Sequence, residues 1–197
     1  MKIGCIQLNV GFGKVDENYE RAEKFIREAA AGGAEIIVLP EMWNTGYALE
    51  KLGELSDVNG ERTKSFLSGL AKELAVHIVG GSGSVKRDDK FYNTMYTYNR
   101  DGELVGEYSK AHLFRLMDEH LYLESGNEMN RFALGELEAG GVICYDIRFP
   151  EWLRSHALDG AKVLFVPAQW PTPRIDHWKI LLQARAIENQ CFVVAVN

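Results

Sequence analysis

The chain has 197 residues, of which 46% are hydrophobic and 25% are charged, and it carries a net charge of −6. This length and composition predict one globular domain, spanning residues 1–197, with enough apolar residues for one core. The acidic balance and the lack of a basic stripe argue against nucleic acid as a partner. No apolar run reaches the length of a membrane span or forms a signal peptide, so no membrane partner is expected.

Apolar β-branched runs alternate with helical patterns along the chain. The first half predicts, in order, a strand at 2–10, a helix at 18–33, a strand at 34–40, a helix at 61–75 and a strand at 76–85. The second half predicts a hairpin at 91–110, a strand at 140–146, a helix at 150–160, a strand at 161–170, a helix at 176–190 and a strand at 191–197. This alternation predicts an α/β fold with helices packed over sheet.

The cysteines indicate the redox environment. Cys5, Cys144 and Cys191 are odd in number, and each lies in an apolar, strand-like run. This pattern favours reduced thiols in the cytoplasm over a disulfide framework. No Cys-x-x-Cys pair or His/Cys cluster indicates a metal site.

Three apolar runs each lead into a reactive side chain: Glu41, Lys110 and Cys144. In layered α/β proteins, sites form at the carboxyl ends of strands, where loops carry the chemistry. Each residue alone also has an ordinary explanation, as a solvated turn charge, a surface lysine and an inert core thiol. The three residues together with their neighbouring residues are a more specific indication of a catalytic site than any one of them alone.

Four segments carry a family resemblance: LPEMWNTGY around Glu41, YSKAHLF around Lys110, CYDIRFPEW from Cys144, and ARAIENQCFVVAVN at 184–197. With these segments in this order, the chain resembles the carbon–nitrogen hydrolases of the nitrilase superfamily over essentially its whole length. The resemblance implies a four-layer α-β-β-α sandwich, here expected to lack the C-terminal strands of the family. It also implies a homodimer or higher homo-oligomer, no metal or organic cofactor, and a small amide and water as reactants.

The resemblance also assigns roles. Cys144 is the expected nucleophile, Glu41 the general base, and Lys110 with the backbone N–H of Tyr145 the donors to the oxyanion. In the segment DEHLYLESG, Glu119 matches a second family glutamate, which the resemblance implies is catalytic: it is expected to hydrogen-bond Lys110 and assist proton transfer. Glu124 is the competing choice.

The substrate is harder to predict. The segments HLFRLMDEH and PAQWPTPRIDHW resemble bacterial ω-amidases associated with methionine salvage, which makes the terminal amide of a 2-oxo or dicarboxylic acid, such as 2-oxoglutaramate, the expected substrate. Its carboxylate needs a cation, for which Arg174 is the candidate. Tyr47 and Trp170 are expected to wall the pocket, although Trp170, like Trp43, also suits core or dimer packing. Arg148 is expected to be structural, paired with Asp146 or Glu151.

Other functions remain open at this stage. They are a truncated, catalytically silent binding or assembly module of the same fold, a hydrolase of nitriles or carbamoyl compounds, and an N-acyltransferase. A Cys–His hydrolase is disfavoured, because none of the five histidines lies in a suitable segment, and His112 is expected to brace its loop.

Overall fold

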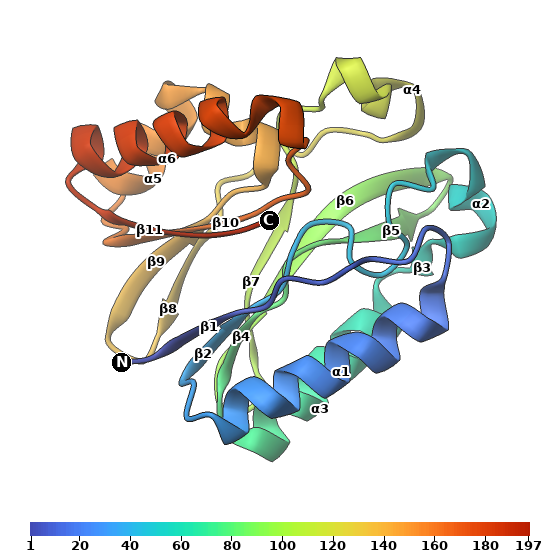
Figure 1. The fold of residues 1–197 in the computed structure, drawn as a ribbon, viewed down its shortest axis with the longest axis horizontal. Coiled ribbons are helices and arrows are strands. Elements are labelled where there is room, and N and C mark those ends of the chain that lie inside the picture. The colour runs from blue at the N-terminus through green and yellow to red at the C-terminus, as the bar shows by residue number, and fades with distance from the viewer.

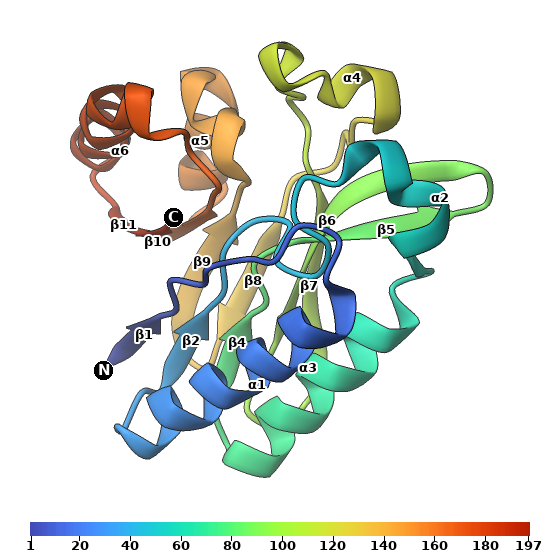
Figure 2. The same ribbon diagram turned by 45° about the vertical axis from the view of Figure 1, so that its right-hand side comes forward.

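The computed structural model describes residues 1–197 as four stacked layers (Figure 1). Two β-sheets face each other, and helices cover the outer face of each. The helices α1, Val15–Ala31, and α3, Glu61–Leu74, cover the first sheet. The helices α5, Pro150–Leu158, and α6, Ile175–Asn189, cover the second (Figure 2). The prediction of an α-β-β-α sandwich is confirmed.

The first sheet has seven strands in the order β1-β2-β4-β6-β5-β3, with β7 paired to β6. Their bounds are β1 Ile3–Cys5, β2 Ile36–Val38, β3 Asp57–Val58, β4 His77–Val79, β5 Gly83–Arg87, β6 Lys90–Tyr98 and β7 Leu104–Ser109. The strands β1, β2 and β4 are parallel, and β6 is antiparallel to β4, β5 and β7.

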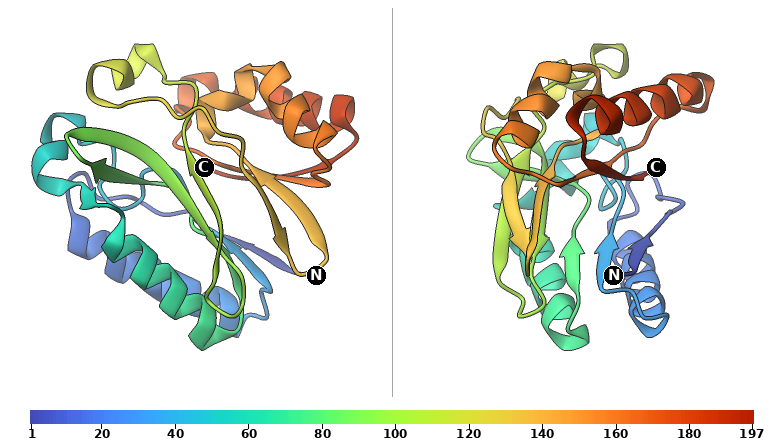
Figure 3. Two further views of the ribbon diagram at one scale, coloured as in Figure 1. Left: turned by 180° about the vertical axis from the view of Figure 1, so that it is seen from behind. Right: turned by 90° about the vertical axis from the view of Figure 1, so that its left-hand side faces the viewer.

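The second sheet has four strands in the order β11-β10-β9-β8. Their bounds are β8 Arg131–Leu134, β9 Leu137–Gly141, β10 Val163–Pro167 and β11 Phe192–Val196. The strands β9, β10 and β11 are parallel, while β8 and β9 form a hairpin. The edge strands β1 and β11 lie on the same side of the molecule (Figure 3), where Gln7 Nε2 donates to the Asn197 carbonyl at 3.3 Å.

Apolar burial explains the layering. On α1, Tyr19, Ala22 and Ile26 recur at helical spacing and are buried against the first sheet. Between the sheets, Met95 of β6 packs in one cluster with Phe165 of β10. Each large apolar side chain buried in this way stabilises the fold by roughly 1.5–3 kcal/mol.

Two predicted strands need correction. The run 76–85 forms two strands, β4 and β5, because the chain turns at Gly81. Gly81 has φ +58°, and a Cβ there would lie 2.1 Å from the Pro40 carbonyl oxygen, so only glycine fits. The strand predicted at 140–146 is β9, which ends at Gly141, and Cys144 begins a 3-10 helix, η3, Cys144–Arg148.

Sequence patterns missed several short elements. These are η1 Leu49–Lys51, α2 Leu52–Leu55, β3, η2 Arg115–Met117, α4 Glu119–Tyr122, β8 and η4 Thr172–Arg174. All have four residues or fewer, which is too short to display a hydrophobic period. Among them, α4 carries a side chain into the site described next.

Candidate active site

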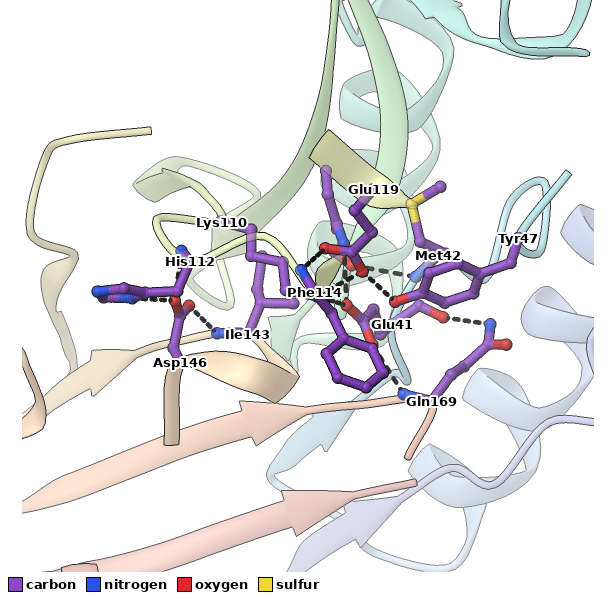
Figure 4. Close-up of polar contacts among 12 residues, drawn as sticks. Glu41, Met42, Tyr47, Lys110, His112, Phe114, Glu119, Ile143, Asp146 and Gln169 are labelled. Atoms are coloured by element: carbon purple, nitrogen blue, oxygen red, sulfur yellow. Dashed lines mark hydrogen bonds and ion pairs between the residues drawn. The ribbon is translucent and has the colours of Figure 1, made fainter. Parts of the chain in front are cut away.

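The ends of three strands bring the predicted side chains together. Glu41 follows β2, Lys110 follows β7, and Cys144 opens η3 after β9. Lys110 Nζ lies 2.8 Å from Glu41 Oε1 and 2.7 Å from Glu119 Oε1 (Figure 4). The side chains of Glu41, Lys110 and Glu119 have no exposed surface. An ammonium group bridging two buried carboxylates therefore forms the base of the site.

Glu41 is fixed by donors on both carboxylate oxygens. Its Oε1 accepts from Lys110 Nζ and from Asn93 Nδ2 at 2.9 Å. Its Oε2 accepts from the backbone N–H of Gln169 at 2.9 Å, and the side-chain amide of Gln169 donates to the Glu41 carbonyl at 2.6 Å. These contacts hold the carboxylate in one orientation.

Glu119, at the N-terminus of α4, lies in the site, and Glu124 does not. Glu119 Oε1 accepts from Lys110 and from the Tyr47 hydroxyl at 2.9 Å, and its Oε2 accepts from the backbone N–H of Phe114 at 2.8 Å. Glu124 is exposed and lies 3.5 Å from Lys90.

Cys144 is buried and has φ +46°, a backbone conformation that non-glycine residues rarely adopt. Such strain persists only where the surroundings impose it. Asp146 fixes the adjoining backbone, because its Oδ2 accepts from the Ile143 N–H at 2.9 Å and from the Tyr108 hydroxyl at 2.7 Å. The first turn of η3 is thereby closed directly beside the thiol.

The other oxygen of Asp146 holds His112. Asp146 Oδ1 lies 2.9 Å from the backbone nitrogen of His112 and 2.8 Å from its Nδ1. The imidazole also stacks on Phe149, with ring centroids 3.7 Å apart. His112 thus ties the loop after Lys110 to η3, in agreement with the bracing position expected from the sequence.

The charges in the site favour a protonated thiol beside an ionised carboxylate. Burial, and next the Glu41 charge, raise the pKa of Cys144 well above its usual value. Burial acts to raise the pKa of Glu41 too, but the charge and hydrogen bond of Lys110 outweigh it and lower the pKa. Burial raises the pKa of Glu119, since Lys110 only partly offsets it and Glu41 adds to it. The ionised Glu41 carboxylate is therefore placed to accept the proton of the Cys144 thiol.

A small, partly enclosed pocket opens onto the thiol. It is lined by Tyr47, Phe114, Met117, Cys144, Arg148, Gln169, Trp170, Pro171 and Arg174. All three residues predicted to bind substrate, Tyr47, Trp170 and Arg174, thus line one cavity. Trp43, by contrast, is fully buried in the core and donates to the Gly80 carbonyl at 2.7 Å.

The expected pairing of Arg148 with Asp146 or Glu151 is wrong. Arg148 lines the pocket, and its guanidinium lies 5.1 Å from the centroid of the Trp170 ring. Asp146 is instead saturated by Tyr108, His112 and the Ile143 N–H. Neither Arg148 nor Arg174 pairs with an acid, and both line the pocket wall. Arg148 Nη2 lies 3.3 Å from His177 Nδ1.

Sequence reasoning missed Asn93 and Gln169. Gln169 lies two residues past the end of β10, within the run predicted as a strand at 161–170, and a position just past a strand end was a usable signal, as for Glu41. Asn93 lies within β6, where no local pattern distinguishes it.

No three His, Cys, Asp or Glu side chains are grouped so that they could hold a metal ion. None of the helices is both long and apolar enough to span a bilayer.

A buried thiol, a carboxylate and an ammonium group at one pocket of a layered α/β sandwich form an arrangement suited to nucleophilic attack on an electrophilic carbon. Comparison with known families agrees with this class. The carbon–nitrogen hydrolase family model matches residues 2–197. The chain belongs to this family, and it is a carbon–nitrogen hydrolase.

The chain is also similar to individual members of the family. The chain is 53% identical to a 2-oxoglutaramate amidase of Bacillus subtilis (strain 168) over 195 residues, which are 99% of this chain and 75% of that protein. It is 35% identical to the human omega-amidase NIT2, covering 100% of this chain and 74% of that protein. Among solved structures, Saccharomyces cerevisiae Nit3, of the nitrilase superfamily, superimposes with a TM-score of 0.91 at 30% identity, covering 100% of this chain and 74% of that one.

Proposed function

We propose that this hydrolase cleaves the terminal amide of a small 2-oxo or dicarboxylic acid, with 2-oxoglutaramate as the first candidate, through a thioester on Cys144. The observation that carries the proposal is the pocket itself, which joins the thiol to two arginines without acidic partners. Similarity to a 2-oxoglutaramate amidase supports the same substrate. The other reactant is water.

In the first half-reaction, Glu41 takes the Cys144 proton as the sulfur bonds to the amide carbon. The carbonyl oxygen becomes an oxyanion, which Lys110 Nζ and the Tyr145 N–H stabilise. Tyr145 is the second residue of η3, where a backbone N–H has no acceptor within the helix. The C–N bond then breaks, the nitrogen takes the proton from Glu41, and ammonia leaves.

The second half-reaction regenerates the enzyme. Glu41 takes a proton from water as the hydroxyl oxygen bonds to the thioester carbon. The C–S bond breaks, the sulfur recovers the proton, and the acid product leaves. Glu119 has the role of holding Lys110 in place, which the 2.7 Å contact between them supports.

Substrate selection follows from the pocket wall. Arg174 and Arg148 bind the substrate carboxylate, while Tyr47 and Trp170 enclose its carbon chain. Since a neutral amide gains nothing from the arginines, an acidic amide is the better substrate.

The test is ammonia release from 2-oxoglutaramate and succinamate, with butyramide as a neutral amide of similar length. Higher kcat/KM for the two acids supports the proposal. Higher kcat/KM for butyramide would contradict the carboxylate subsite. No release from any amide, by folded protein, would favour a catalytically silent binding module.

We also propose that the enzyme works as a homodimer in the cytoplasm. Leu158, Ile180 and Ile187, on the outer helices α5 and α6, are between 62% and 81% exposed, which supports a covered face there. Three free cysteines support a reducing compartment. Light scattering during gel filtration tests the dimer.

A further inference from the structure

Asn93 is the one residue that contacts both Glu41 and Lys110 without facing the pocket. It lies on β6 and has no exposed surface. Its side-chain Nδ2 donates to Glu41 Oε1 at 2.9 Å, and its backbone carbonyl accepts from the Lys110 N–H at 2.9 Å. The strand therefore carries a fixed link between the base and the ammonium group.

The acceptor sites of Glu41 can be counted. Two carboxylate oxygens offer about four lone-pair directions. Lys110 and Asn93 occupy both directions on Oε1, and the Gln169 N–H occupies one on Oε2. Only Oε2 retains an open direction for a further proton.

The other end of the same amide has no partner. Asn93 Oδ1 is buried and makes no hydrogen bond. An unpaired buried carbonyl oxygen costs free energy, which an apolar side chain of similar size would avoid. The hydrogen bond donated to Glu41 is therefore the contact that accounts for an amide at this position.

We propose that Asn93 is a positioning residue that saturates Glu41 Oε1 and so directs the Cys144 proton to Oε2. The inference rests on the proposed role of Glu41 as the base. The donated hydrogen bond also favours the ionised form of Glu41, since it stabilises the charge. Without it, the carboxylate holds its own proton at higher pH and rotates more freely.

The test is the pH dependence of Cys144 alkylation by iodoacetamide, followed on the Cys144 peptide by mass spectrometry. This readout needs no substrate, so it separates failure of this inference from a wrong choice of amide. In Asn93→Leu, we expect the pH at which the alkylation rate falls off on the acid side to rise by about one unit, because Glu41 loses a hydrogen bond that stabilises its charge. Where an amide substrate is turned over, kcat falls about tenfold and KM stays the same.

Thr97→Val is the matched control. Thr97 lies on the same strand, is fully buried and has an unpaired hydroxyl, but it contacts neither Glu41 nor Lys110. We expect its profile to match that of the wild type. Asn93→Asp, which keeps the shape but places a second acid against Glu41, should move the limb upward as well.

An unchanged acid limb in Asn93→Leu or Asn93→Asp would overturn the proposal, as would an equal shift in Thr97→Val. Failure of both Asn93 variants to fold would also overturn it, because Asn93 would then be needed for the fold itself.

Discussion

Among the buried carboxylates near the nucleophile, Glu41 and Asp146 have different surroundings. Glu41 contacts an ammonium group and influences the thiol, and it keeps one acceptor direction open. Asp146 is surrounded by Tyr108, His112 and the Ile143 N–H, which occupy both of its oxygens. A carboxylate with remaining capacity can exchange a proton, whereas a saturated one fixes the backbone. Glu41, after β2, is thus suited to proton transfer, and Asp146, within η3, is suited to holding the backbone beside the nucleophile.

The largest expected effect is on Glu41. Glu41→Gln keeps the shape and the contact with Lys110 but removes the base, so kcat should fall by about 10²–10⁴. The melting temperature should fall only modestly, because the glutamine oxygen still accepts from Lys110 and Asn93 and only the Gln169 N–H loses its acceptor. Steady-state ammonia release and thermal unfolding, measured on the same preparation, check both. Activity close to that of the wild type would remove Glu41 from proton transfer.

Asp146→Ala should lower the stability of the fold much more than Glu41→Gln does. It leaves the Tyr108 hydroxyl and the Ile143 N–H without an acceptor in the interior, so the free energy of unfolding should fall by about 3 kcal/mol or more. Activity is lost as well, because η3 no longer holds Cys144 in its strained conformation. Denaturant unfolding measures the stability. A stability loss in Glu41→Gln as large as in Asp146→Ala would erase the distinction between the two carboxylates.

Arg174→Ala tests whether the pocket wall binds the substrate carboxylate, and its expected effect on catalysis is smaller than that of Glu41→Gln. We expect KM for 2-oxoglutaramate to rise about tenfold to a hundredfold, because a charge-assisted hydrogen bond is lost, while KM for butyramide stays unchanged. Arg148→Ala is the companion variant, expected to act in the same direction. An equal rise for the acidic and the neutral amide would exclude carboxylate binding by these arginines.

The smallest expected effect is on the pH dependence of stability, through His156, a buried side chain outside the active site. His156 has its pKa lowered, chiefly by burial, and its Nε2 accepts from the Asn130 N–H at 3.1 Å. A lowered pKa in the folded state means that stability is present above the unfolded value of about 6.5 and is lost as the pH falls through the folded pKa. Unfolding measured between pH 7.5 and 5 should therefore show decreasing stability. The decrease should be smaller in His156→Gln, and an identical decrease would assign it to other groups such as His77.

The sequence allowed prediction of the layered fold and of the side chains that follow strands. Glu41, Lys110 and Cys144 stand just past apolar runs. Of the two glutamates considered, Glu119 contacts Lys110 and Glu124 contacts Lys90. Asn93 was not predictable, because its contact with Glu41 joins residues 52 positions apart in a strand without a local signal.

Arg148 was misplaced for a related reason. Sequence proximity to Asp146 and Glu151 suggested a pair, but the tight turn of η3 directs the arginine to the pocket wall, beside Trp170. The cavity requires residues from loops after β2, β7, β9 and β10, and their mutual distances are set only by the packing of the two sheets.

The most direct measurement is the mass of the Cys144 peptide after the enzyme is mixed with 2-oxoglutaramate and quenched in acid. The account predicts an acyl group on Cys144, formed with release of one ammonia and absent in Cys144→Ala. Ammonia release by Cys144→Ala at the wild-type rate, or an acyl group on Cys5 or Cys191 instead, would contradict it.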